Sequence, residues 1–140
     1  MLMNPILQWL ISCAALFIAN YLWALHDWYF WDAKTQAWIR KHFKDWHNLK
    51  SLWILFLFLS VKTIPLRLDT WKGLIPLVIW LFAKWFSWEF ACHGIPSSKK
   101  YTGASNQWLG NIFWIRNKWH AILFYVISVS IGLYYIYAVL

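Results

Sequence analysis

Five histidines and several aspartates are the residues of this chain with the clearest potential for chemistry, because imidazole and carboxylate groups bind transition metals. The histidines are His26, His42, His47, His93 and His120. The predicted topology places all of them on one side of a membrane, together with Asp27, Asp32 and Asp45. Such a layer could hold iron or zinc. The spacing weakens this hypothesis, since His42 and His47 are five residues apart and diverge on a helix. We predict no resident cofactor and keep a small metal-dependent membrane enzyme as the alternative.

A lysine and a glutamate stand inside an apolar segment, in WLFAKWFSWEF over residues 80–90. Counted from Gly73, Lys84 lies about 16 Å into the membrane, near the midplane of a core about 30 Å thick. A lysine at that depth costs about 2.5–3.5 kcal/mol on insertion scales, so it needs a partner. Trp80, Lys84 and Trp88 share one helical face, and the ammonium can lie over an indole ring. Asn20 and Ser60 are the nearest polar residues by depth.

This pattern predicts that Lys84, Glu89, Trp80 and Trp88 contact protein rather than lipid. The sequence leaves open whether that protein is the same chain, a second copy or another subunit. A further alternative is a small transporter or pore in which Lys84 and Glu89 line a polar path.

The elements that carry these residues are four apolar segments. The chain has 140 residues, of which 61% are hydrophobic and 13% charged, against about 25% charged in soluble domains. Fourteen tryptophans fit the same class, because Trp concentrates at membrane interfaces. We predict an all-α integral membrane protein that forms a single bundle. Its four transmembrane helices are expected over residues 5–25, 49–65, 73–92 and 119–140.

Basic residues orient the bundle, because cytoplasmic loops are enriched in Lys and Arg. Nine of them lie in the two long loops, whereas Arg67 and Lys72 lie in the short one. We therefore predict a multi-pass protein of the cell membrane with both termini outside and both long loops cytoplasmic. Residues 38–46 have the spacing of an amphipathic helix at the interface. On it, Arg40, Lys41 and Lys44 are predicted to contact lipid head groups.

Charge and cysteines exclude other classes. The net charge is +8, but no run of five basic residues and no nucleic-acid motif accompanies it, so we predict no nucleic-acid partner. Cys13 and Cys92 fall on the order of 15 Å apart in depth, beyond the ~7 Å limit between disulfide-bonded Cα atoms, and should be free thiols. The predicted function is a non-catalytic accessory or structural subunit of a larger membrane assembly. Its predicted partners are membrane lipids and other subunits or copies of itself.

Overall fold

Helices make up the fold in the part of the chain that the structure describes. A computed structural model describes residues 3–28, 37, 39–42, 46–94 and 117–140. Its long helices are α1 (Pro5–Trp28), α3 (Trp46–Lys62), α4 (Ile75–Gly94) and α7 (Lys118–Val139). A 3₁₀ turn, η1 (Trp71–Leu74), leads into α4, and the described residues contain no strand. The prediction of an all-helical protein is therefore confirmed.

Helix ends follow from local sequence signals. The Asn4 side-chain oxygen accepts a hydrogen bond from the backbone N–H of Ile6 at 2.8 Å, and Pro5 opens α1. Asn117 caps α7 in the same way, because its side-chain oxygen accepts from the N–H groups of Trp119 and His120 at 3.0 Å. The helix α3 ends at Lys62, three residues before Pro65, as the steric restriction ahead of proline favours.

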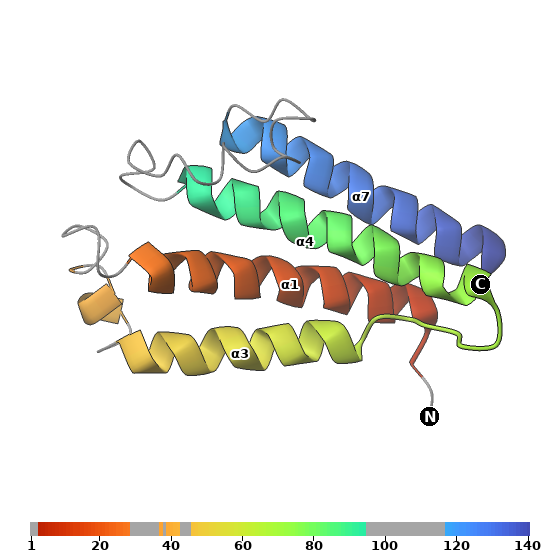
Figure 1. The fold of residues 1–140 in the computed structure, drawn as a ribbon, viewed down its shortest axis with the longest axis horizontal. Helices are drawn as coiled ribbons and strands as arrows, with labels where there is room; N and C mark the ends of the chain where they lie inside the picture. Colours follow the sequence, from red (N-terminus) through yellow and green to blue (C-terminus); the bar gives the residue numbers. More distant parts are fainter. Residues whose placement is uncertain (1–2, 29–36, 38, 43–45, 95–116) are drawn as a thin grey trace.

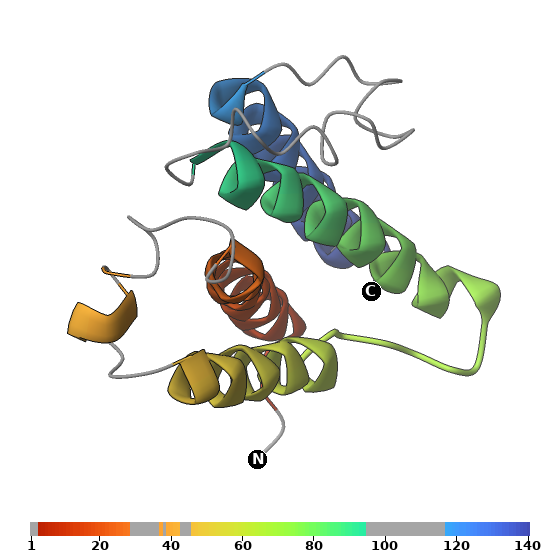
Figure 2. The same ribbon diagram turned by 60° about the vertical axis from the view of Figure 1, so that its left-hand side comes forward.

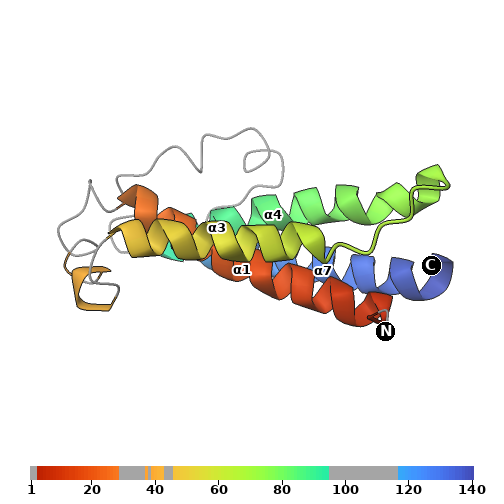
Figure 3. The ribbon, with the colours of Figure 1, turned by 90° about the horizontal axis from the view of Figure 1, so that it is seen from below.

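The helix α1 occupies the centre of the arrangement and packs against α3, α4 and α7. Figures 1 and 2 show α3 and α7 at opposite edges of the bundle. The helices α1 and α4 run in one direction, and α3 and α7 return in the other, so both chain ends lie at the same end of the bundle (Figure 1). Seen from below, α3 lies along α1 for most of its length (Figure 3).

Three of the helical segments are long and apolar enough to cross a membrane. Within the described ranges these are Pro5–His26, Trp71–Ala91 and Lys118–Val139. The 17 residues of α3 do not make a fourth candidate by length and composition. These helices are compatible with a multi-pass membrane protein. The crossing by α3, the side on which each loop lies and the interfacial helix remain predictions.

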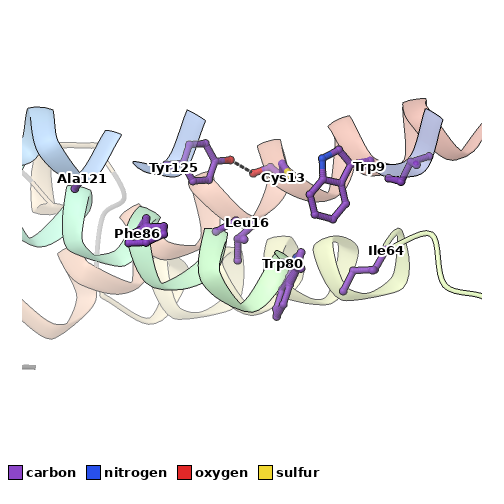
Figure 4. Close-up of a cluster of buried hydrophobic side chains, with 10 residues drawn as sticks. Trp9, Cys13, Leu16, Ile64, Trp80, Phe86, Ala121 and Tyr125 are labelled. Atoms are coloured by element: carbon purple, nitrogen blue, oxygen red, sulfur yellow. Dashed lines mark hydrogen bonds between the residues drawn. The ribbon is translucent and has the colours of Figure 1, made fainter. Parts of the chain in front are cut away.

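Two apolar clusters form the core. The first contains Trp9, Cys13, Leu16 and Tyr125, and Figure 4 shows the Tyr125 hydroxyl directed at the backbone oxygen of Cys13. That hydrogen bond is 2.6 Å long and joins α7 to α1. The second cluster includes Ile39, a fully buried residue of the short helical stretch 39–42. The neighbours of Ile39 on its C-terminal side are exposed, so this stretch has one buried and one basic face.

Candidate functional site

Lys84 lies at the meeting point of α4 and α1. Its side chain is half-buried, and its ammonium nitrogen lies 5.4 Å from the centre of the Trp23 ring. The indole partner therefore belongs to α1, whereas the sequence suggested Trp80 or Trp88 of the same helix. Since α1 and α4 run side by side in the same direction, a lysine on one helix can reach the next helix with its long side chain.

Trp23 is the centre of a tryptophan cluster that joins three helices. Its ring stacks on Trp53 of α3, with centroids 5.3 Å apart and planes 13° apart. The Trp23 ring also meets Trp88 of α4, with centroids 5.0 Å apart and a tilt of 46°. These geometries are the offset and tilted arrangements that aromatic pairs prefer. The contacts with Trp53 and Trp88 fix the Trp23 ring in place beside the Lys84 ammonium.

Asn20 fixes the position of Lys84 along the axis of α1. Its side-chain amide donates to the Lys84 carbonyl oxygen at 2.8 Å and to the Ser87 hydroxyl oxygen at 2.5 Å. The Ser87 hydroxyl in turn donates to the same Lys84 carbonyl at 2.9 Å. Interhelical bonds of this kind hold membrane helices in register. These bonds hold the backbone of Lys84, and they do not involve its ammonium group. The ammonium interacts with the Trp23 ring instead.

A cavity of about 270 Å³ lies beside this lysine and is lined by Trp23, Lys84, Trp85 and Trp88. Lys84 forms no ion pair with any residue in the described ranges. The indole N–H of Trp85 is buried and has no hydrogen-bond partner within the described part of the chain. Ammonium and indole groups donate hydrogen bonds and accept none. The side-chain polar groups of the lining therefore suit a ligand that accepts hydrogen bonds.

Trp80 and Glu89, which were predicted to contact a partner, are covered by the chain itself. Trp80 is 5% exposed, and its indole N–H donates to the Ser60 hydroxyl at 2.9 Å. Glu89 has no exposed surface. Only Lys84 and Trp88 keep part of their surface outside the bundle. Contact of these four residues with a second chain remains a prediction.

The predicted histidine layer is only partly within the described structure. His26 is half-buried near the end of α1. Three others are exposed: His42, His47 and His120. The side chains of His93, Asp27, Asp32 and Asp45 lie outside the described residues. Among the side chains that are described, no three from His, Cys, Asp and Glu come together as a group that could hold a metal.

Of the residues predicted to contact head groups, Arg40 and Lys41 are exposed and Lys44 lies outside the described residues. Cys13 is a buried free thiol, and the Cys92 side chain lies outside the described residues.

Sequence reasoning missed Trp23, Trp53 and Trp85 as parts of this site. Their only signal was the abundance of tryptophan, which does not say which rings meet. Comparison with known proteins adds no analogy for the site: no protein-family model matches the chain, and neither a curated protein nor a solved structure is significantly similar to it.

Proposed function

We propose that this chain is a non-catalytic accessory or structural subunit of a membrane assembly, acting through helix–helix and lipid contacts in the cell membrane. The observation that carries the proposal is how the buried polar side chains are used. In the described helices Ser12, Asn20 and Ser60 tie one helix to another, whereas the Ser128 hydroxyl donates within α7. Ser12 pairs with Ser60 between α1 and α3, and the Trp9 N–H donates to the Val129 carbonyl of α7 at 3.0 Å.

The outer face of α7 is the surface that a partner helix would use. Only 22% of the most apolar stretch of α7 is buried, against 44% in α1. Its large exposed side chains recur every three or four residues along one face: Leu123, Ile127, Ile131, Tyr134 and Tyr137. Ser128 and Gly132 face the bundle instead. This leaves a mainly apolar face, which also carries the exposed Ser130, for a helix of another subunit.

Lipid contact is supported by charge at one end of the bundle. Arg40, Lys41, Lys50 and Lys118 are exposed. Lys50 lies in the second turn of α3 and Lys118 is the first residue of α7, and these two helices begin at the same end of the bundle (Figure 1). Clusters of basic residues beside membrane helices attract anionic lipid head groups. We propose that this end faces the cytoplasm.

Native mass spectrometry of the protein extracted in mild detergent tests the subunit role. The expected particle is heavier than the 16.9 kDa chain. Replacing Ile127 and Ile131 together by Trp adds bulk to the outer face of α7 without adding polarity, and should release the bare chain. Leu55→Trp is the matched control, since Leu55 is 60% exposed on the outer face of α3. Release by the control as well, or by neither variant, would contradict docking through α7.

Metal content read from the same sample tests the alternative enzyme. A bare chain that carries one iron or zinc would overturn the proposed role. Loss of that metal from a His42→Ala, His47→Ala double variant would assign it to the histidine layer.

A further inference from the structure

We propose that the cavity formed by Trp23, Lys84, Trp85 and Trp88 binds the anionic head of an amphiphile from the surrounding leaflet. The chemical class is a phosphate or carboxylate head on a hydrocarbon tail. This inference goes beyond the proposed subunit role and does not depend on the outer face of α7.

The hydrogen-bonding chemistry of the lining calls for an acceptor. Lys84 brings an ammonium with three donors, and the lining tryptophans bring one N–H each. The Trp85 N–H is buried and lacks a partner within the described residues, so a donor beside the cavity stays unsatisfied in the protein alone. Buried donors are costly to leave unpaired. A ligand with acceptor oxygens removes that cost.

The charge of Lys84 calls for an anion rather than a neutral acceptor. The interaction of its ammonium within the described chain is with the Trp23 ring at 5.4 Å, and none of its described neighbours forms an ion pair with it. A cation–π contact compensates only part of the cost of placing a charge among apolar groups. An anionic head would complete the environment of the ammonium.

The position of the cavity along the helices suits a lipid head. Trp23 lies three residues before the end of the candidate span Pro5–His26, and Trp88 lies three residues before the end of Trp71–Ala91. At 1.5 Å per residue, both are about 4.5 Å inside the apolar segment, whereas the Lys84 backbone is about 10.5 Å inside. The Lys84 side chain reaches back toward the interface, since its ammonium lies 5.4 Å from the Trp23 ring. Tryptophan prefers this interfacial depth. The nearby end of the bundle also carries the exposed basic residues Arg40, Lys41, Lys50 and Lys118, which favour anionic lipids.

The size of the cavity indicates which part of the amphiphile it holds. About 270 Å³ is just below the range of about 300–1,000 Å³ that encloses a whole drug-sized ligand. The head therefore occupies the cavity and the tail lies outside it. Val78 and Leu81, both about half exposed, share a face of α4 with Trp85 and Trp88. They extend the apolar wall from the cavity toward the membrane interior, which is the direction a lipid tail takes.

Lipid titration followed by native mass spectrometry tests the proposal on the full chain. The probes are phosphatidylglycerol, oleate and phosphatidylcholine. We expect one anionic adduct on the wild type, about tenfold or more weaker binding in Lys84→Gln, and retention in Lys84→Arg. Lys50→Gln is the control, because it removes an exposed charge from the same end of the bundle. It should change binding by less than about twofold, the effect of a solvent-screened charge.

Each outcome of the titration bears on the proposal. Lys84-dependent binding of phosphatidylglycerol identifies a phospholipid phosphate as the head, and Lys84-dependent binding of oleate alone identifies a carboxylate. Equal binding of phosphatidylcholine would overturn the proposal. So would unchanged binding in Lys84→Gln, or an equal loss in Lys50→Gln. If Lys84→Gln does not fold, Trp85→Phe tests the same cavity, because it removes the unpaired indole N–H and should weaken binding of the anionic lipid; unchanged binding in that variant would overturn the proposal.

Discussion

Ser12 and Ser60 hydrogen bond to each other reciprocally: each hydroxyl donates to the backbone carbonyl oxygen of the other residue at 2.7 Å. Both residues are fully buried, one in α1 and one in α3. The Ser60 hydroxyl oxygen also accepts the Trp80 N–H from α4. A single pair of small polar residues therefore connects three helices, at a place where no side chain larger than serine separates the backbones of α1 and α3.

Ser60→Ala should destabilise the bundle. The substitution removes the donor to the Ser12 carbonyl and the acceptor of the Trp80 N–H, so two interhelical hydrogen bonds are lost. Hydrogen bonds between membrane helices contribute about 0.6 kcal/mol on average, and the expected loss is about 1–2 kcal/mol in the free energy of unfolding. Unfolding in a mixed detergent with increasing SDS, followed by circular dichroism, measures it.

Ser130→Ala is the matched control for that experiment. Ser130 is exposed on α7, and its hydroxyl donates to the Val126 carbonyl of its own helix at 2.8 Å. We expect a change within about 0.5 kcal/mol, as for other surface substitutions. Equal stability of Ser60→Ala and the wild type would show that the Ser60 hydroxyl adds nothing to helix association.

Gly132→Ala should destabilise the contact between α7 and α1, although alanine is the better helix former by about 0.8–1 kcal/mol. A Cβ atom at position 132 would lie 2.1 Å from a ring carbon of Trp9. Trp9 is fully buried and is held by its bond to the Val129 carbonyl, so the ring has little room to move. We expect a loss of about 1–3 kcal/mol, typical of overpacking.

A second substitution shows whether the clash with Trp9 is the cause. In the Trp9→Phe background the smaller ring leaves space, so Gly132→Ala should cost less there than in the wild type. Thermal unfolding in detergent of the wild type, the two single variants and the double variant gives the coupling free energy between positions 9 and 132. If Gly132→Ala is more stable than the wild type, helix propensity outweighs the contact, and the Trp9 ring does not limit the side chain at position 132.

Labelling of introduced cysteines tests whether α3 crosses the membrane. In a Cys92→Ser background, Cys13 is buried and should stay unlabelled. Asp69→Cys places a thiol in the short loop, where the Asp69 side chain is 57% exposed. Lys50→Cys places one at the start of α3. On intact cells a membrane-impermeant maleimide should label position 69 at once, and position 50 only after permeabilisation.

The two possible failures of the labelling have different meanings. Labelling of both positions from one side would show that α3 does not cross. Labelling on opposite sides in the reverse order would confirm the crossing and overturn the predicted orientation.

The sequence was sufficient for the helices but not for their contacts. Long apolar runs and end signals such as Asn4 and Pro65 placed four helical segments within a few residues of their observed bounds. Depth alone selected both Asn20 and Ser60 as neighbours of Lys84, since depth follows from the count of residues along each helix. Ser60 instead bonds Ser12 and Trp80. The structure shows that Asn20 bonds the Lys84 carbonyl and not its ammonium.

The rotation of each helix about its axis was the missing information. Trp23, Trp53 and Trp88 meet only because α1 turns one face to both α3 and α4. With fourteen tryptophans in the chain, composition offers many pairings and no means of choosing among them. The cavity beside Lys84 depends on that choice and was therefore not visible in the sequence.

The order of the helices along the chain has a consequence for biogenesis. The most extensive packing joins α1 with α3 and α4 with α7, and each of these pairs follows in sequence. The α1–α3 hairpin can therefore close while α4 and α7 are still being synthesised, and α4 can then pair with α7, because local contacts form before distant ones. The slower event is then the meeting of the two hairpins along α1 and α4. Asn20 and Ser87 join α1 to α4, the contact between the two hairpins. We therefore expect substitutions at these residues to slow folding more than substitutions within either hairpin.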